Sequence, residues 1–240
     1  MIEHEKLAHK LSWAPLEENG IPIATLVDDG SLVESQLEEF LSETEILQAA
    51  KYSVAKERRH FTLRKCFQRA FVASVIGWDG PLKTLALVHQ RDTQPHCPQA
   101  PQWHLSFSSS GLTYLAGASN IGPIGIDIER ERKIENALQL AERFFSPFEA
   151  AALSRLDEPE LNRHFLLMWT AKEAALKAIG KGIVSGLNTF TFKRAAQTDR
   201  YVIQDAPDSP DLWGLFHLDF IPGHLVAVVK KIVVDKAEVT

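Results

Sequence analysis

Cysteine is scarce in this sequence, and the two cysteines that occur, Cys66 and Cys97, lie far apart along the chain. A disulfide framework or a thiolate zinc site needs several cysteines at short, regular spacings, so both are excluded. We therefore expect two reduced thiols in a cytoplasmic protein. Apolar stretches are far shorter than the roughly 18 residues of a membrane span, and residues 1–13 lack the apolar core of a signal peptide.

Positive charge is also in short supply. The chain carries 26 Lys and Arg against 31 Asp and Glu, a net charge of −5. Nucleic-acid-binding proteins usually carry a basic excess, so we expect no nucleic-acid partner. Apolar residues make up 45% of the 240 residues, which is enough for a sizeable core. We expect a globular protein that acts as a monomer, away from membranes.

Capping residues and apolar periodicity predict helices and strands in both halves of the chain. A capping box at Ser42 and Glu45 begins a helical region that breaks near Tyr52 and ends at Gly77. Further helices are expected at 137–145, from Pro147, and from Pro159 to Gly180. Strands are expected at 21–27, 82–90, 103–107, 112–119, 124–129, 212–220 and 225–234.

The order of these elements is similar before and after a turn near Gly122. Each half offers strands and a long helix, without an internal sequence repeat. The pattern favours an α+β fold of two related halves, residues 1–122 and 123–240.

The stretch GIDIER, residues 125–130, places two carboxylates side by side. Successive side chains of a strand point to opposite faces, so Asp127, Glu129 and Gly125 share one face. Three isoleucines occupy the other face. The glycine predicts that something approaches the carboxylate face closely.

Trp169, Glu173 and Lys177 follow at helical spacing i, i+4, i+8, on one face of an otherwise apolar helix. An exposed Glu–Lys pair would be ordinary, but a largely buried helix needs partners for its charges. Together with Asp127 and Glu129, this helix supplies three carboxylates and a lysine. Carboxylate oxygens suit Mg²⁺, and a lysine beside it can neutralise phosphate oxygens.

Two further features favour an anion. Arg64 has Phe61, Phe67 and Phe71 at helical spacing around it, so its guanidinium lies close to the core and needs a negative partner. The run SSSG at 108–111 follows a predicted strand, where turn N–H groups and hydroxyls could hold a phosphate.

The blocks GIDIE at 125–129, RFFSPFE at 143–149 and WTAKEAALKAIGKGI at 169–183 resemble the signature blocks of 4'-phosphopantetheinyl transferases. The sequence is most similar to the two-lobed, surfactin-synthetase-activating type. Residues 41–69 resemble the N-terminal helical block of that type. The resemblance runs from about residue 41 to about residue 230, and its specificity lies in the order and spacing of the blocks.

This resemblance implies two α+β subdomains packed as a pseudo-dimer and a reaction with coenzyme A. Mg²⁺ would be held by Asp127, Glu129 and Glu173, and the serine of an apo acyl or peptidyl carrier protein would receive the phosphopantetheine arm. Asp127, Glu173 and Lys177 match catalytic positions, with Lys177 also on the pyrophosphate. Arg64 matches an arginine used on the 3'-phosphate. Glu149 matches an acidic family position, although a capping box with Ser146 explains it equally well.

The sequence departs from this type where it usually has Gly-Lys-Pro and Ser-His-Ser. Here these places read Thr93-Gln94-Pro95 and Ser108-Ser109-Ser110, so a phosphate-binding lysine and histidine are missing. Each lost charge-assisted hydrogen bond is worth roughly 1.5–3 kcal/mol. We count Gln94, Ser108 and Ser109 among the expected coenzyme A contacts, with Arg59 and Arg91 as substitutes for the missing charges.

Two other functions fit the same residues. An acidic pair with a later Glu and Lys also suits a different Mg²⁺-dependent phosphoesterase. The missing Lys and His also fit a non-catalytic module that binds coenzyme A or a carrier protein. The complete set of Asp127, Glu129, Glu173 and Lys177 favours transfer over both alternatives.

Overall fold

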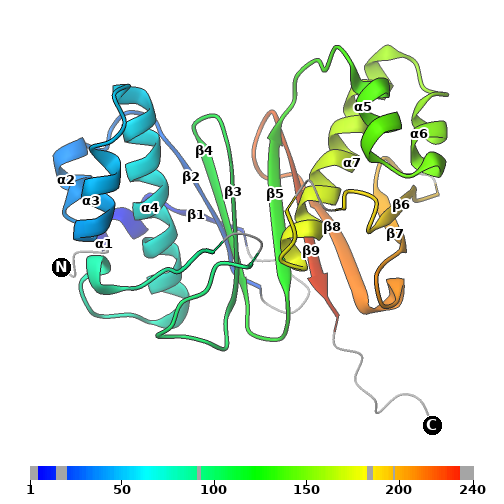
Figure 1. Ribbon diagram of the computed structural model, residues 1–240. Coiled ribbons are helices and arrows are strands. Elements are labelled where there is room, and N and C mark those ends of the chain that lie inside the picture. The colour runs from blue at the N-terminus through cyan, green and yellow to red at the C-terminus, as the bar shows by residue number, and fades with distance from the viewer. Residues whose placement is uncertain (1–4, 15–20, 91–92, 183–185, 197, 233–240) are drawn as a thin grey trace, which may run out of the picture. The chain divides into compact units, whose positions relative to one another are not determined.

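The computed structural model describes residues 5–14, 21–90, 93–182, 186–196 and 198–232. These residues divide into two compact units, one within Met1–His89 and Pro95–Ser119, the other within Gln90–Gln94 and Asn120–Thr240. Each unit combines helices with antiparallel strands, which confirms the predicted α+β class (Figure 1). In these ranges no helix has both the length and the apolar character required to cross a membrane.

The first unit is built on a four-stranded antiparallel sheet in the order β1-β2-β4-β3. Its strands are β1 (Ser12–Trp13), β2 (Ile23–Val27), β3 (His104–Ser110) and β4 (Thr113–Ser119). Its helices are α1 (Glu5–Ala8), α2 (Glu34–Glu38), α3 (Glu43–Ala49) and α4 (Ala55–Ile76). The long helix α4 contacts the other three helices and packs against β4, so Phe67 and Phe71 lie in the core with Leu105.

The helix signals of this unit are confirmed. Ser42 and Glu45 form the predicted capping box at the start of α3. The chain leaves the helical conformation between Ala49 and Ala55, and α4 ends at Gly77 in the left-handed region with φ of 68°. Only glycine adopts this conformation without steric penalty, which explains the stop.

The strand predicted at 82–90 is wrong. Leu82–Thr84 is a short 3-10 helix, and Val88 makes only an isolated bridge with His96. Leu82 and Leu85 are both buried in the core. A spacing of three residues turns two side chains to the same side in a 3-10 helix but to opposite faces in a strand, so the core selects the helix.

The serine run is also placed differently from the prediction. Ser108, Ser109 and Ser110 belong to β3 and pair with β4, and the turn follows at Gly111, whose φ is 61°. The serines therefore present their side chains from a strand, rather than their backbone N–H groups from a turn.

The second unit contains a three-stranded antiparallel sheet in the order β5-β9-β8. Its strands are β5 (Ile124–Arg130), β8 (Trp213–Leu218) and β9 (His224–Lys231), which confirms the predicted C-terminal hairpin. A separate hairpin, β6 (Thr191–Arg194) with β7 (Tyr201–Asp205), was not predicted. The helices are α5 (Ala137–Phe144), α6 (Pro147–Leu153) and α7 (Glu158–Ala178), and α7 packs against β5 and β9 (Figure 1).

Gly125 is the point where β5 meets α7. A Cβ atom at this position would overlap the carbonyl oxygen of Ala174 and the backbone nitrogen of Ala178. The close neighbour that the glycine predicts is therefore the backbone of α7. Because Asp127 lies on the same face of β5, it is buried beside this helix and is only 2% exposed.

We expect Gly125→Ala to destabilise the protein, because the added methyl group must push α7 away from β5. Overpacking of a tight contact usually costs about 1–3 kcal/mol, and backbone atoms cannot rotate aside as a side chain can. Chemical denaturation should show this loss in the free energy of unfolding. Gly223→Ala is the matched control, because its Cβ position has no atom within 4 Å and only its positive φ opposes the change. Equal stability of Gly125→Ala and wild type would contradict the close packing.

Candidate functional site

The sequence-predicted acidic residues of the second unit come together where β5 packs on α7. The Lys177 ammonium on α7 donates to Asp127 Oδ1 on β5 over 2.7 Å. Trp169, Glu173 and Lys177 are all half-buried, while most of their neighbours on α7 are buried. Trp169, Glu173 and Lys177 therefore lie along the partly exposed side of α7, next to the face of β5 that carries Asp127 and Glu129.

Glu173 has an unusual acidity for a glutamate. Burial, and next the negative charge of Asp127, raise its pKa to about 7. The charge of Glu129 acts in the same direction, whereas Lys177 and a hydrogen bond from Trp169 oppose the shift. The three carboxylates are thus close enough to repel one another, and near neutral pH Glu173 can exist with or without its proton.

The three carboxylates are the metal ligands predicted from the sequence. Across the described ranges, no three His, Cys, Asp or Glu side chains are arranged together as metal ligands. Instead, Lys177 pairs with Asp127, and Arg132 Nη1 lies 2.9 Å from Glu129 Oε2. A set made only of carboxylate oxygens, whose members repel one another, fits a hard divalent cation such as Mg²⁺.

The sequence leaves open whether Glu149 belongs to the acidic site or only to a capping box. In the structure its side chain lies in the protein interior. Its side chain and that of Lys172 are both fully buried, with 2.9 Å between Lys172 Nζ and Glu149 Oε2. The carboxylate also accepts from the backbone nitrogens of Ser146 and Phe192, each over 2.8 Å. These contacts use both of its oxygens inside the protein. Lys172 was missed by sequence reasoning, because nothing local to it indicates a partner 23 residues away.

In the first unit, Arg64, Ser108 and Ser109 lie together. They line a cavity of about 120 Å³ with Phe107 and Tyr114. Within the part of the chain that the structure describes, Arg64 makes no ion pair, although its guanidinium lies over the ring of Phe61 at 5.8 Å. A half-buried guanidinium without a carboxylate, next to two serines, is suited to bind a phosphate.

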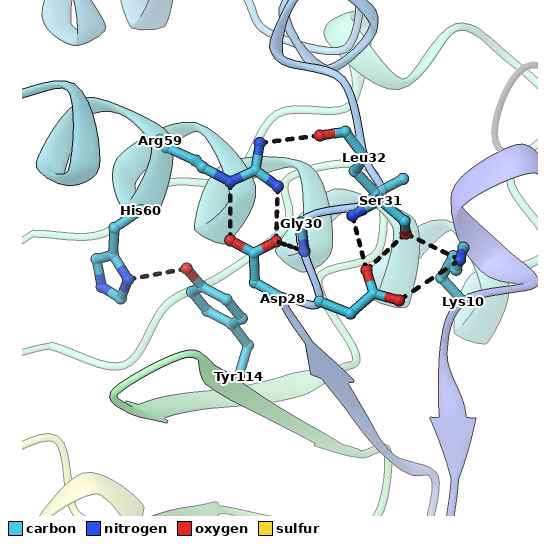
Figure 2. Close-up of polar contacts among 9 residues, drawn as sticks. Lys10, Asp28, Gly30, Ser31, Leu32, Arg59, His60 and Tyr114 are labelled. Carbon is cyan, nitrogen blue, oxygen red and sulfur yellow. Dashed lines mark hydrogen bonds and ion pairs between the residues drawn. The ribbon is translucent and has the colours of Figure 1, made fainter.

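A second cavity of about 440 Å³ also reaches Arg64. Tyr52, Lys56, His60 and Tyr114 contribute to its walls, and sequence reasoning missed this role for all four. His60 Nδ1 lies 2.8 Å from the Tyr114 hydroxyl, at hydrogen-bond distance (Figure 2). Burial, and then the charge of Arg64, lower the pKa of His60, while burial raises the pKa of Tyr114 to about 12. Lys56, His60 and Arg64 lie on one face of α4 at helical spacing, which is a signal that the sequence offered, whereas Tyr114 on β4 lies 54 residues beyond His60.

Arg59 and Gln94, two expected coenzyme A contacts, donate to the protein itself. Arg59 forms a two-point ion pair with Asp28, over 2.6 and 2.8 Å, and donates to the carbonyl of Leu32 (Figure 2). This bonding lowers the pKa of Asp28. The Gln94 amide lies on three backbone carbonyls of the second unit. Arg91, the other substitute for the missing charges, lies outside the described residues.

Comparison with known proteins identifies similar sequences of one kind. The sequence profile of the 4'-phosphopantetheinyl transferase superfamily matches residues 123–229. The chain is 31% identical over 148 residues to the 4'-phosphopantetheinyl transferase psf-1 of Bacillus pumilus, covering 62% of this chain and 61% of the relative. It is 33% identical over 135 residues to Sfp of Bacillus subtilis, covering 56% and 58%. HetI of Nostoc is 31% identical over 163 residues, covering 62% and 65%. The matches thus span about three fifths of each relative's length.

Proposed function

We propose that this chain is a member of the 4'-phosphopantetheinyl transferase superfamily, whose sequence profile matches residues 123–229, and that it transfers the 4'-phosphopantetheine arm of coenzyme A to a serine of an apo carrier protein. The observation that carries the proposal is the contact between Asp127 and Lys177, with Glu173 one turn before the lysine. Acyl and peptidyl carrier proteins are the expected partners. The monomeric state and the cytoplasmic location expected from the sequence remain predictions.

The proposed reaction needs charge neutralisation and positioning more than covalent chemistry by the protein. The serine oxygen attacks the β-phosphorus of coenzyme A, the bond to the α-phosphate oxygen breaks, and 3',5'-ADP leaves. Asp127, Glu129 and Glu173 would hold a Mg²⁺ ion, which when bound neutralises the pyrophosphate. Lys177 exchanges Asp127 for a phosphate oxygen, which its four-carbon stem and partial exposure allow.

Glu173 is the proposed acceptor of the serine proton, directly or through a water. A general base works best when its pKa lies near the working pH, and burial together with the charge of Asp127 raises the pKa of Glu173 to about 7. Arg64, with Ser108 and Ser109, is the proposed site of the 3'-phosphate. Arg59 already donates to Asp28 and Leu32, so the proposal depends on Arg64 rather than on Arg59.

The proposal is tested by incubating the protein with coenzyme A, Mg²⁺ and a panel of apo carrier proteins. A gain of one phosphopantetheine arm in the mass of a carrier protein, lost when the metal is chelated, is the expected result. Hydrolysis of coenzyme A without a gain in mass would instead identify a phosphoesterase. Calorimetric binding of coenzyme A without either reaction, unchanged by Glu173→Ala, would identify a non-catalytic module.

We expect Ser109→His to tighten the binding of coenzyme A. Ser109 lines the cavity beside Arg64, and an imidazole there adds a donor for the proposed 3'-phosphate. One hydrogen bond to a charged group contributes about 1.5 kcal/mol, which corresponds to roughly a tenfold lower Kd. Titration calorimetry measures this Kd. Ser110→His is the control, because Ser110 follows on the same strand but is not among the residues that line the cavity. An unchanged or higher Kd for Ser109→His would contradict the proposed phosphate site.

A further inference from the structure

Gln94 connects two elements of the second unit. Its Nε2 donates to the carbonyl oxygens of Ile124, Lys177 and Ala178 over 2.9, 3.0 and 3.1 Å. All three neighbours are acceptors, so the amide nitrogen must face them, and its two hydrogens are shared among the three carbonyls. Pro95 follows directly and restricts the backbone of Gln94 to an extended conformation. The side chain is thus presented from a pre-set backbone.

Two of these carbonyls belong to the C-terminal end of α7, where the helix cannot satisfy its own acceptors. Gly180, with φ of 67°, ends the helix, and the backbone nitrogens of Lys181 and Gly180 donate to Leu176 and Lys177. This arrangement is a Schellman motif. It leaves out the carbonyl of Ala178, which is one of the acceptors of Gln94. Gln94 therefore completes the cap of α7.

The third carbonyl belongs to Ile124, the first residue of β5. One amide group thus joins the last turn of α7 to the strand that carries Asp127. Lys177 is held at both ends, because its carbonyl accepts from Gln94 while its ammonium donates to Asp127. The position of the lysine relative to the carboxylate face depends on where α7 lies along β5, and Gln94 is hydrogen-bonded to both elements.

We infer that Gln94 is a positioning residue for the transfer reaction, which acts by holding Lys177 and Glu173 of α7 against Asp127 of β5. The inference rests on the proposed function. It differs from the role expected from the sequence, in which Gln94 contacts coenzyme A. A positioning residue changes kcat, because small displacements of charged groups affect the transition state, whereas a residue on coenzyme A changes the KM for that substrate.

The test compares Gln94→Met with the wild-type full-length protein, using coenzyme A, Mg²⁺ and an apo carrier protein. Methionine has a similar length but cannot donate a hydrogen bond. We expect kcat to fall roughly 10- to 100-fold, the cost of a displacement of about 1 Å, while both KM values stay within about threefold. The assay temperature is kept well below the midpoint of thermal unfolding of the variant, so that loss of folded protein does not contribute.

Gln94→Lys and Gln94→Glu complete the series. A lysine carries three donors and should restore much of kcat, whereas a glutamate carries only acceptors toward three carbonyls and should be worse than methionine. If Gln94→Met folds poorly, the comparison of Gln94→Lys with Gln94→Glu replaces it. A higher kcat for Gln94→Lys than for Gln94→Glu would then support the positioning role. Gln99→Met is the matched control, since Gln99 is exposed and its amide donates to a single carbonyl, that of Thr84 in the first unit.

The outcomes separate this inference from the proposed function. A wild-type protein that transfers nothing would overturn the proposed function. An active wild type with Gln94→Met within twofold of its kcat, or with a loss confined to the KM for coenzyme A, would overturn only the positioning role. A fall in kcat that Gln94→Lys reverses supports it.

Discussion

Asp127→Asn is expected to reduce phosphopantetheine transfer by roughly a thousandfold, comparable to the removal of a key electrostatic group from an active site. Asparagine keeps the shape of the side chain but removes the negative charge. Asp127 lies on β5, donates no proton in the proposed reaction and is the carboxylate that meets Lys177 at 2.7 Å. Without this charge, Lys177 loses its ion pair and the proposed metal ion loses one anionic ligand. The rate of mass gain of an apo carrier protein measures the effect.

The fold should survive this substitution. Asp127 is buried, but asparagine still offers an oxygen to Lys177, and a mutual repulsion with Glu173 disappears. We therefore expect thermal unfolding within a few degrees of wild type. Asp199→Asn is the control, because Asp199 is an exposed carboxylate paired with Arg194 and lies outside the site. Transfer by Asp127→Asn at more than a tenth of the wild-type rate would rule out a central role for this carboxylate.

Glu149→Ala is expected to lower the free energy of unfolding by about 3–5 kcal/mol, because it leaves a fully buried lysine without its counter-ion. Lys172 would keep only the carbonyls of Leu187 and Phe190, at 2.7 and 2.9 Å. The backbone nitrogen of Phe192 would also lose its acceptor. Denaturant unfolding measures the loss, which for a protein of ordinary stability is a large fraction of the total.

A matched pair of variants separates the buried charge from packing. Removing both charges together, with Glu149→Leu and Lys172→Met, should recover part of the stability lost in Glu149→Ala, because no unpaired charge remains. Glu158→Ala breaks an exposed pair with Lys133 and should cost less than about 1 kcal/mol. If the single and double variants of the buried pair were equally unstable, the lost packing would be the cause rather than the charge.

The parts of this protein that the sequence predicts are those set by neighbours in the chain. The stripe of Trp169, Glu173 and Lys177 follows from helical spacing, and the shared face of Asp127 and Glu129 follows from alternation in a strand. The capping boxes at Ser42 and Ser146 are confirmed for the same reason, since all their atoms lie within four residues. Local geometry was enough to place the acidic residues on their elements.

What could not be predicted depends on distant partners. Whether residues 82–90 form a strand depends on a neighbouring strand with which they can pair. Instead, Leu82–Thr84 forms a 3-10 helix, and Leu82 and Leu85 are buried in the core. Gln94 looked like a replacement for a phosphate-binding lysine, but its acceptors lie 30 and more than 80 residues further along the chain. Glu149 gave a correct capping signal that concealed its stronger contact with Lys172.

The membership of Gln90–Gln94 in the second unit has a consequence for synthesis and for dissection of the gene. Gln94 leaves the ribosome long before the carbonyls of Lys177 and Ala178 exist. Its hydrogen bonds to them must therefore form late, after most of the polypeptide has been made. A fragment cut at Ser119 and Asn120 would carry the acidic strand and the long helix but not the amide that joins them. Two halves expressed separately should therefore need each other to regain activity, even if each one folds.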